Sequence, residues 1–144
     1  MSQDYARHGV TALATDFIIR LQEISGRFAV CRLTHGDTLP PWVTASRIYS
    51  IVQTLDELTV VCQAEVVPAG VICEQPWRCV RVAGSMPFSV TGVMAAITQP
   101  LAQAGISVFA LSTYDTDYLL VQEVNWERAK EQWAAAGLSM LKRR

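Results

Sequence analysis

The chain has 144 residues, about half of them hydrophobic, and its 12 basic and 13 acidic side chains leave a net charge of -1. A chain of this length buries roughly 70% of the surface that its unfolded form exposes, so neither a metal nor a disulfide is needed for folding. It fits one domain, or two very small ones that share a core. The balanced charge and high hydrophobic content exclude a disordered chain and a nucleic-acid binder that relies on a basic surface.

The sequence contains no sign of a membrane span or a signal peptide. No apolar run approaches the roughly 20 residues that a transmembrane helix needs, and residues 1–9 lack the charged-then-apolar order of a secretory signal. The only basic cluster, Lys142-Arg143-Arg144, is predicted to be a solvated tail. We therefore expect a cytoplasmic protein that binds neither membrane nor nucleic acid, while a homo-oligomer remains open.

The first third of the chain is predicted to hold an extension, two strands and a loop. Residues 1–14 carry mixed signals and are predicted to be a loose or helical extension. Phe17, Ile19 and Leu21 favour a strand narrowly over a competing helix across residues 10–24. A Ser-Gly pair at positions 25 and 26 then predicts a turn into a second strand at residues 28–33.

Adjacent prolines at positions 40 and 41 exclude a regular helix interior, so residues 34–47 are predicted to be a loop. Two strand–turn–strand patterns follow in the chain, one over residues 48–62 and one over residues 106–121. At a spacing of 60 residues, Ile48 matches Val108 and Val61 matches Val121, which indicates an internal repeat. The first copy has no room for a full helix before its hairpin, so it is predicted to be degenerate.

A strand at residues 77–82, a helix from about Val90 and a second helix near the C-terminus complete the predicted elements. Apolar residues recur at helical spacing up to Ala104, and Gly105 is a suitable stop. Pro100 predicts a kink or a break near Ala96. The last helix is predicted to have Asn125 as its N-cap, Gly137 past its end and one buried face made of Trp126, Ala129, Trp133 and Ala136.

The four cysteines, Cys31, Cys62, Cys73 and Cys79, lie far apart with no CxxC pair. In a cytosolic chain they are predicted to be reduced thiols that pack as small apolar groups. No metal site or cofactor is expected, because His8 and His35 are the only histidines that could join a cysteine as ligand. No phosphate-binding glycine loop and no nucleophile with a matching base is present, so an enzyme is not expected.

The strand at 77–82, the helix after it and the strand at 106–111 form a predicted βαβ crossover, whose strands run parallel. Their C-terminal ends then bring together the loop at 84–89, the helix N-terminus and the polar turn at 112–117. Free backbone donors at the helix start suit a carboxylate, and Asp115 or Asp117 suits an ammonium group, a pair of contacts that describes a free amino acid. The alternative is that Ser, Thr and Asp here only close a turn.

The run SMPFSVTGVMAAITQPLAQAGISVFALSTYDTDYLLV, together with FAVCRL, PPW, TLDELTVVC and WRCVRVAG, resembles the ACT-domain family. Within that family it is similar to the small tandem-ACT proteins that include bacterial homologues of the CASTOR arginine sensors. The resemblance covers about residues 28–137. It implies an α+β fold of two tandem ferredoxin-like βαββαβ units, the first degenerate, with antiparallel or mixed sheets and helices on one face. The implied function is that of a non-catalytic regulatory sensor that holds a small molecule, an amino acid, between its ACT units.

The resemblance also implies a ligand site and domain boundaries. Ten residues would line the site, with Asp117 as the acidic contact: Gly84, Ser85, Met86, Phe88, Ser89, Ser112, Thr113, Tyr114, Asp115 and Asp117. Arginine-sensing relatives have an acidic residue at the helix start, whereas residues 88–91 here carry no charge, which argues against arginine as the ligand. The expected domains are an N-terminal extension (1–15), a degenerate ACT-like half (16–68) and an ACT-like half (69–144). The alternative function is a protein–protein interaction module with no small-molecule ligand.

Overall fold

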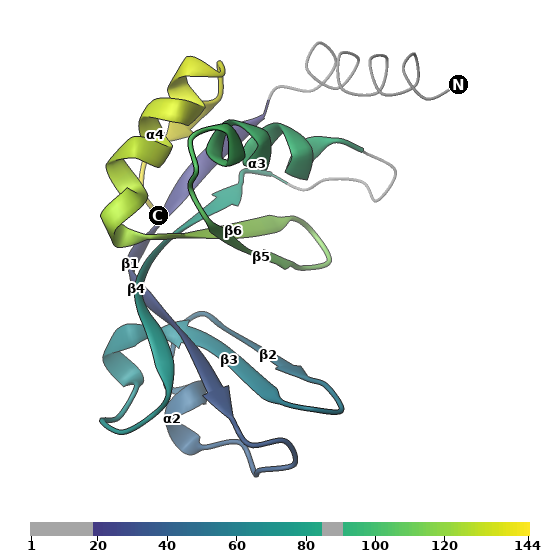
Figure 1. Cartoon of the computed structure of the whole chain (residues 1–144), viewed down its shortest axis with the longest axis vertical. Coiled ribbons are helices and arrows are strands. Elements are labelled where there is room, and N and C mark those ends of the chain that lie inside the picture. The colour runs from purple at the N-terminus through teal and green to yellow at the C-terminus, as the bar shows by residue number, and fades with distance from the viewer. Residues whose placement is uncertain (1–18, 85–90) are drawn as a thin grey trace. The chain divides into compact units, whose positions relative to one another are not determined.

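The computed structural model in Figure 1 describes residues 19–84 and 91–144, so the predicted extension and Phe17 lie outside the described residues. The fold is α+β, as predicted. In chain order the elements are β1 (Arg20–Leu33), α2 (Pro41–Thr44), β2 (Tyr49–Gln53), β3 (Leu58–Gln63), η1 (Ala64–Val66), β4 (Cys73–Val82), α3 (Val93–Gln103), β5 (Val108–Ser112), β6 (Asp117–Gln122), η2 (Glu123–Asn125), α4 (Trp126–Ala135) and β7 (Ser139–Leu141).

The chain divides into two compact units. Unit 1 consists of Met1–Ser25 and Cys79–Arg144, and unit 2 is the continuous segment Gly26–Arg78. The strands β1 and β4 each contribute residues to both units. The domain boundaries expected from the sequence divide the chain according to its internal repeat. The two units are instead defined by contacts between residues, so the expected boundaries remain a prediction.

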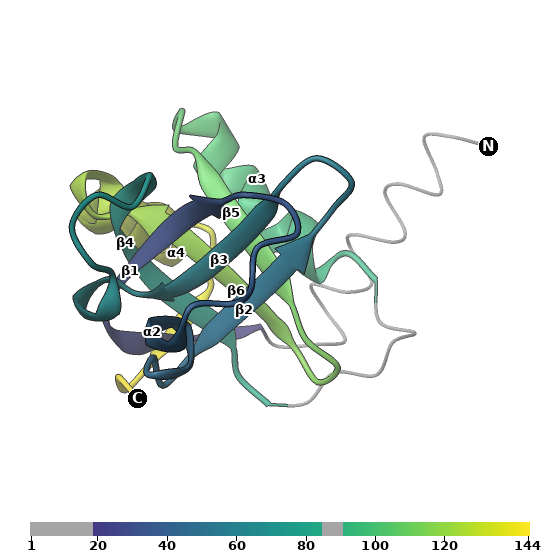
Figure 2. The same cartoon turned by 90° about the horizontal axis from the view of Figure 1, so that it is seen from below.

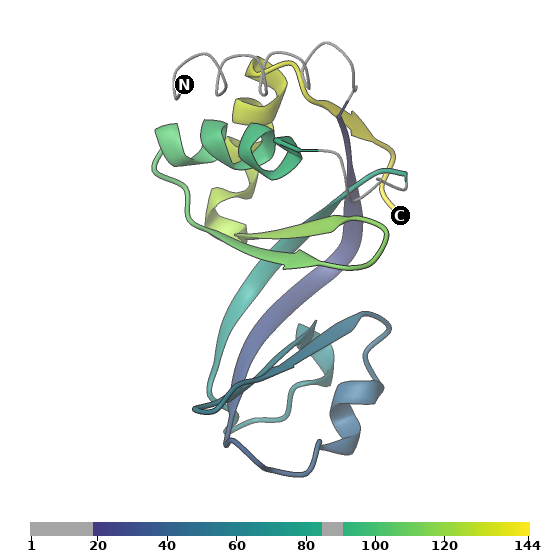
Figure 3. The same ribbon diagram turned by 90° about the vertical axis from the view of Figure 1, so that its right-hand side faces the viewer.

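Unit 1 has the strand order β7-β1-β4-β6-β5. β7 pairs parallel with β1, with Leu21 opposite Met140. The amide of Ala83 donates to the carbonyl of Arg20 at 2.8 Å, and Arg81 Nε donates to Gln22 Oε1 at 2.9 Å, so β4 runs antiparallel to β1. The segment from β4 to β7 follows the βαββαβ order, and the first half of β1 is inserted between its first and last strands. α3 and α4 both cover one face of the β5–β6 hairpin (Figures 1 and 3).

Aromatic side chains of α4 anchor the core of unit 1. Trp133 is fully buried, its indole Nε1 donates to the carbonyl of Ile97 at 2.9 Å, and its ring meets that of Trp126 edge to face at 6.0 Å. Trp126 and Ala129 are buried as predicted. Ala136 is exposed, which corrects the predicted face, because the helix ends at Ala135 and Ala136 is its C-cap. Truncation of such a buried tryptophan costs roughly 3–5 kcal/mol.

Unit 2 has the strand order β2-β3-β1-β4. β2 and β3 form the predicted hairpin, with Gln53 opposite Leu58, and β3 pairs antiparallel with β1. Val43 of α2 is fully buried and packs against Ala29 and Val60 of this sheet. The segment predicted to be a loop thus contains one short helix. It begins at Pro41, where the missing amide of proline costs nothing because a first-turn amide has no partner within the helix.

Two other predictions about local structure are wrong. The predicted turn at positions 25 and 26 lies inside a single continuous strand, and Gly26 adopts a φ of +98° there, a conformation that favours glycine. Because this strand begins at Arg20, the competing helix predicted over residues 10–24 does not include residues 20–24. The second is the break near Ala96: α3 runs without interruption from Val93 to Gln103, with Ile97 and Leu101 buried, while the alternative of a kink stays a prediction. One lost hydrogen bond is offset by this packing, and Gly105, at φ +71°, follows the helix as predicted.

The basic C-terminal residues are exposed, as predicted for a solvated tail, but their backbone is hydrogen-bonded to β1. After β7, the amide of Arg144 donates to the carbonyl of Glu23 at 2.9 Å, and the amide of Ser25 donates to the carbonyl of Arg144 at 2.8 Å. Arg143 also forms an ion pair with Glu23 at 3.2 Å. The basic side chains are exposed, but the backbone that carries them is held along β1.

Candidate functional site

The candidate site is built around the turn that joins β5 to β6. The amide of Thr113 donates to the carbonyl of Thr116 at 2.8 Å, and the amide of Thr116 donates back to Thr113 Oγ1 at 3.2 Å. Such local bonds from a threonine hydroxyl are typical of turns. Thr113, one of the predicted site residues, therefore closes the turn.

A residue missing from the prediction, Thr116, fixes where this turn lies. Thr116 is buried, and its hydroxyl donates to the carbonyl of Val82 at 2.8 Å. The turn is thereby tied to the C-terminal end of β4. Gly84 follows, exposed and at φ +83°. Four further predicted site residues, Ser85, Met86, Phe88 and Ser89, lie outside the described residues.

The carboxylate of Asp117 is the acidic group at this corner. Asp117 is the first residue of β6, is half-buried and lies opposite Ser112 in the hairpin register. Ser112 Oγ donates to Asp117 Oδ1 at 2.7 Å, which holds the carboxylate in one orientation. Asp117 also lines a narrow recess together with Val82 of β4 and Met94 of α3.

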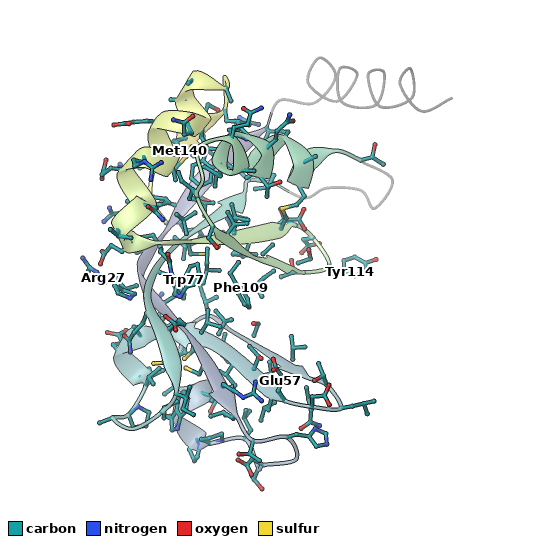
Figure 4. All side chains as sticks on the ribbon, in the orientation of Figure 1. Arg27, Glu57, Trp77, Phe109, Tyr114 and Met140 are labelled. Atoms are coloured by element: carbon teal, nitrogen blue, oxygen red, sulfur yellow. The ribbon has the colours of Figure 1, made fainter. Side chains whose placement is uncertain are left out.

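Tyr114 and Asp115 lie at the tip of the turn, where Figure 4 shows Tyr114 at the end of the hairpin. Both residues are exposed, and 80% of Tyr114 is accessible. The structure therefore brings together Ser112, Thr113 and Asp117 with the end of β4, and it leaves two predicted site residues further out.

The β2–β3 hairpin of unit 2 repeats this turn geometry. The amide of Thr54 donates to the carbonyl of Glu57 at 2.9 Å, and the amide of Glu57 donates to Thr54 Oγ1 at 3.1 Å. Thr54 therefore corresponds to Thr113, a spacing of 59 residues. Strand pairing agrees, since Tyr49 opposite Cys62 and Val108 opposite Val121 also differ by 59. The two hairpins correspond, but the predicted spacing of 60 is wrong by one residue.

The corrected spacing changes which residues are equivalent. Asp115 corresponds to Asp56, and the exposed Tyr114 corresponds to the exposed Leu55. Asp117 corresponds to Leu58, which is only 4% exposed. The threonine and the tip aspartate are thus common to both turns, whereas the Asp117 carboxylate belongs to the second hairpin alone.

The start of α3 carries no side-chain cap among the described residues. Its N-cap is Gly92, at φ +80°. Backbone amides in the first helical turn have no partner within the helix, so they can donate to an anion.

Neither the thiols nor the other potential metal ligands form a metal site in residues 19–84 and 91–144. Cys31, Cys62 and Cys79 are buried and Cys73 is half-buried, all as free thiols, which confirms the predicted apolar packing. Burial, together with the neighbouring Cys62 and Cys73, raises the pKa of Cys31 to about 12, and burial raises the pKa of Cys79 to about 12. Within those ranges no three His, Cys, Asp or Glu side chains are arranged to hold a metal, and no helix is long and apolar enough to cross a membrane.

A family model described as an ACT domain matches residues 72–131, and a model of an N-terminal domain matches residues 26–70. Among solved structures, Atu0741 from Agobacterium tumefaciens is similar, with 33% identity, a TM-score of 0.82 and coverage of 88% of this chain and 95% of that one. Aspartokinase alpha and beta subunits share the fold, with 15% identity, a TM-score of 0.61 and coverage of 83% and 98%.

Curated relatives come from the CASTOR proteins. CASTOR3P of Homo sapiens is 29% identical over 91 residues, and the match covers 54% of this chain and 56% of the relative. The human Cytosolic arginine sensor for mTORC1 subunit 1 is 44% identical over 48 residues, 33% of this chain and 15% of the relative. The chain thus spans about half or less of these relatives' lengths. The matches and the βαββαβ order of unit 1 lead to one conclusion: residues 72–131 of this chain belong to the ACT-domain family.

Proposed function

We propose that this protein is a non-catalytic regulatory sensor that binds a small molecule, an amino acid, at the β5–β6 turn of unit 1. The observation that carries the proposal is the Asp117 carboxylate. It is oriented by Ser112 at 2.7 Å and stands where the equivalent hairpin has a buried leucine. A turn that served only to reverse the chain would not need this carboxylate, because the β2–β3 turn closes without it.

The surroundings suit a zwitterion. Asp117 can accept hydrogen bonds from an ammonium group, and a charge-assisted bond of this kind is stronger than one between neutral groups. The first turn of α3, which begins after Gly92 without a side-chain cap among the described residues, can attract a carboxylate. The Asp117 carboxylate and these helix-end amides match the two charges that every free amino acid carries.

The relatives support the same function. One of them is named an arginine sensor. The ligand of this chain is a separate question, because residues 88–91 lack the acidic side chain that we expect of arginine-sensing relatives. We therefore propose an amino acid other than arginine.

The test is a thermal-shift screen of the protein against the common amino acids, followed by calorimetric titration of those that raise the melting temperature. Ligand at a hundred times its dissociation constant stabilises the native state by about 2.7 kcal/mol. Asp117→Asn keeps the shape but removes the charge, and it should weaken binding by about 1.5–3 kcal/mol, or roughly ten- to hundredfold in Kd.

Asp56→Asn is the matched control, because Asp56 is an exposed acid in the equivalent turn of the other hairpin. It should leave the affinity unchanged. Failure of every amino acid to shift the wild-type protein would contradict the proposed ligand class and favour an interaction module. Equal affinity of Asp117→Asn and wild type would remove Asp117 from the site.

A further inference from the structure

Three of the four cysteines lie in the core of unit 2. Cys31 and Cys62 are buried there, and the half-buried Cys73 packs against the same apolar cluster. They are the only sulfur-containing residues between positions 26 and 78, and Figure 4 shows the sulfur atoms of this unit, in yellow, close together. The proposed ligand site, which lies in unit 1, makes no use of them.

The backbone places Cys31 directly opposite Cys73. β1 lies between β3 and β4 in unit 2, as Figure 2 shows. The amide of Arg32 donates to the carbonyl of Ile72 at 2.9 Å, which makes these two residues a hydrogen-bonded pair of antiparallel strands. The next pair along the two strands, Cys31 with Cys73, is therefore a non-hydrogen-bonded pair. In such a pair the Cα atoms are about 4.5 Å apart and the side chains lie closer together than in a hydrogen-bonded pair.

This spacing suits a disulfide between Cys31 and Cys73. A disulfide joins residues whose Cα atoms are roughly 4.4–6.8 Å apart. Cys62 does not meet this condition, because it lies opposite Ala29 on the other neighbouring strand and is thus diagonal to Cys31. Diagonal residues have Cα atoms roughly 7–8 Å apart, a distance that a disulfide spans only if the backbone moves. Of the two neighbouring thiols, Cys73 is the one that the backbone aligns with Cys31.

The two aligned thiols differ in their access to an oxidant. Cys31 is buried, and burial together with its thiol neighbours raises its pKa to about 12, so it is protected from molecules in solution. Cys73 is half-buried, and Gln75 Nε2 donates to its Sγ at 3.3 Å, a hydrogen bond that favours the thiolate. An oxidant therefore reaches Cys73 first, and Cys31 lies beside it as the second thiol.

We propose that Cys31 and Cys73 form a reversible disulfide that links β1 to β4 within unit 2, with a small disulfide such as oxidised glutathione as the oxidant. The Cys73 thiolate attacks one sulfur of oxidised glutathione, forms a mixed disulfide and releases one glutathione. The Cys31 sulfur then attacks the Cys73 sulfur and displaces the second glutathione. The two cysteines lose two electrons and two protons, and oxidised glutathione gains them as two reduced molecules.

The disulfide closes a loop that contains most of unit 2. α2 and the β2–β3 hairpin both lie between positions 31 and 73 of the chain. A bond that closes such a loop stabilises the folded state mainly because it restricts the unfolded chain. Oxidation at this modification site therefore raises the stability of unit 2, while the native strand pairing stays in place.

Mass spectrometry of the oxidised native protein tests the proposal. The wild type is incubated with oxidised glutathione at mildly alkaline pH, the remaining thiols are alkylated in denaturant, and the proteolytic peptides are mapped. We expect one disulfide, between Cys31 and Cys73, and alkylation of Cys62 and Cys79. The oxidised protein should also melt at a higher temperature than the reduced protein, and dithiothreitol should reverse this shift.

Two variants separate the two steps, and a third is the control. Cys31→Val keeps a buried side chain of similar size and should stop at the mixed disulfide between Cys73 and glutathione. Cys73→Ala should bind no glutathione, and its melting temperature should not change on oxidation. Cys62→Val is the matched control, because Cys62 is a buried thiol of the same cluster, and it should form the disulfide as the wild type does.

A folded wild-type protein that keeps all four thiols after this treatment would overturn the proposal. A mixed disulfide that persists on Cys73, or a disulfide that joins Cys31 to Cys62, would overturn it as well. The result is independent of the proposed ligand site, because Asp117 lies in unit 1. Asp117→Asn should form the disulfide as the wild type does, whether or not any amino acid binds.

Discussion

The two hairpins of this protein share a turn and differ in what the turn carries. Thr54 and Thr113, 59 residues apart, both donate their amide across the turn and accept a turn amide on Oγ1, and an aspartate stands at the tip of each turn. In the first hairpin Glu57 forms an exposed ion pair with Arg32 at 2.8 Å, and Leu58 is buried. In the second, Thr116 is buried against the end of β4 and Asp117 presents a carboxylate.

This difference separates structure from function. Turn chemistry alone explains what both hairpins contain, and it accounts for Thr113 and Asp115. It does not explain what only one of them contains. Thr116 and Asp117 are therefore the residues to examine, one for the position of the turn and one for its chemistry.

The largest effect should come from exchanging Leu58 and Asp117, the residues at the equivalent position of the two hairpins. Leu58→Asp replaces a 4%-exposed apolar side chain with a carboxylate and should lower the free energy of unfolding by about 3–5 kcal/mol. Urea unfolding followed by circular dichroism measures the loss. A change below about 1 kcal/mol would show that the position tolerates charge, and the distinction between the hairpins would fail.

The reverse exchange, Asp117→Leu, should affect binding rather than folding. The half-buried site accepts a leucine, as the first hairpin shows, while the ligand loses a charge-assisted contact of about 1.5–3 kcal/mol. Titration calorimetry with the amino acid found by screening measures the change in Kd. Retained affinity in a folded variant would assign the carboxylate a purely structural role.

Thr116→Val tests how the turn is attached to β4. The substitution keeps the shape but removes the hydroxyl that donates to Val82 at 2.8 Å, so a buried carbonyl loses a partner. We expect a loss of about 1–3 kcal/mol in unfolding free energy and a weaker ligand affinity. Glu57→Gln, at the equivalent half-buried position, should change stability by less than about 0.5 kcal/mol.

Thr54→Val and Thr113→Val should have equal effects if the turns are equivalent. Each removes one hydroxyl that accepts a turn amide, at 3.1 Å and 3.2 Å, and each should cost about 0.5–1.5 kcal/mol. Parallel urea titrations compare the two. A clearly larger effect of Thr113→Val on ligand affinity than on stability would add this hydroxyl to the ligand contacts.

Cys62→Val gives the first hairpin the valine that the second hairpin has at the equivalent position, Val121. The two side chains are similar in size, so stability at pH 7 should change by less than about 1.5 kcal/mol. Burial raises the pKa of Cys62, and the pKa of Cys31 stands at about 12, so these thiols favour the folded state below the unfolded thiol pKa near 9. That contribution is lost as the pH rises from 9 towards 12, at up to about 1.4 kcal/mol per pH unit for each thiol. Urea titrations between pH 9 and pH 12 should show that the free energy of unfolding falls less steeply with pH for Cys62→Val than for the wild type.

Much of the architecture could be predicted because it depends on local signals. Glycine stops, the spacing of apolar residues and two clear hairpins define α3, α4 and the four hairpin strands. Strand register could not be predicted in the same way. Val60, Val61 and Cys62 are all buried, as are Leu119, Leu120 and Val121, so neither run alternates between apolar and polar residues. A shift of one residue then leaves the apolar pattern intact, and only the turn hydrogen bonds determine the spacing of 59.

β1 and Thr116 show two other limits of the sequence. A Ser-Gly pair predicts a turn because glycine accepts a positive φ, but a bend within one long strand uses the same property. The charge of Asp117 and the resemblance of the surrounding sequence to the family predict it as a site residue. Thr116 had no distinguishing signal, because its role depends on a carbonyl that lies 34 residues earlier in the chain.

The order in which the two units can fold during synthesis follows from the insertion of unit 2 into unit 1. Gly26–Arg78 is continuous and can fold as soon as it leaves the ribosome. The first half of β1 is made before it but pairs with β7, so Leu21 meets Met140 only when synthesis is nearly complete. The first half of β1 therefore stays unpaired on that side until β7 has been synthesised. Unit 1 is consequently the later of the two units to become stable during translation.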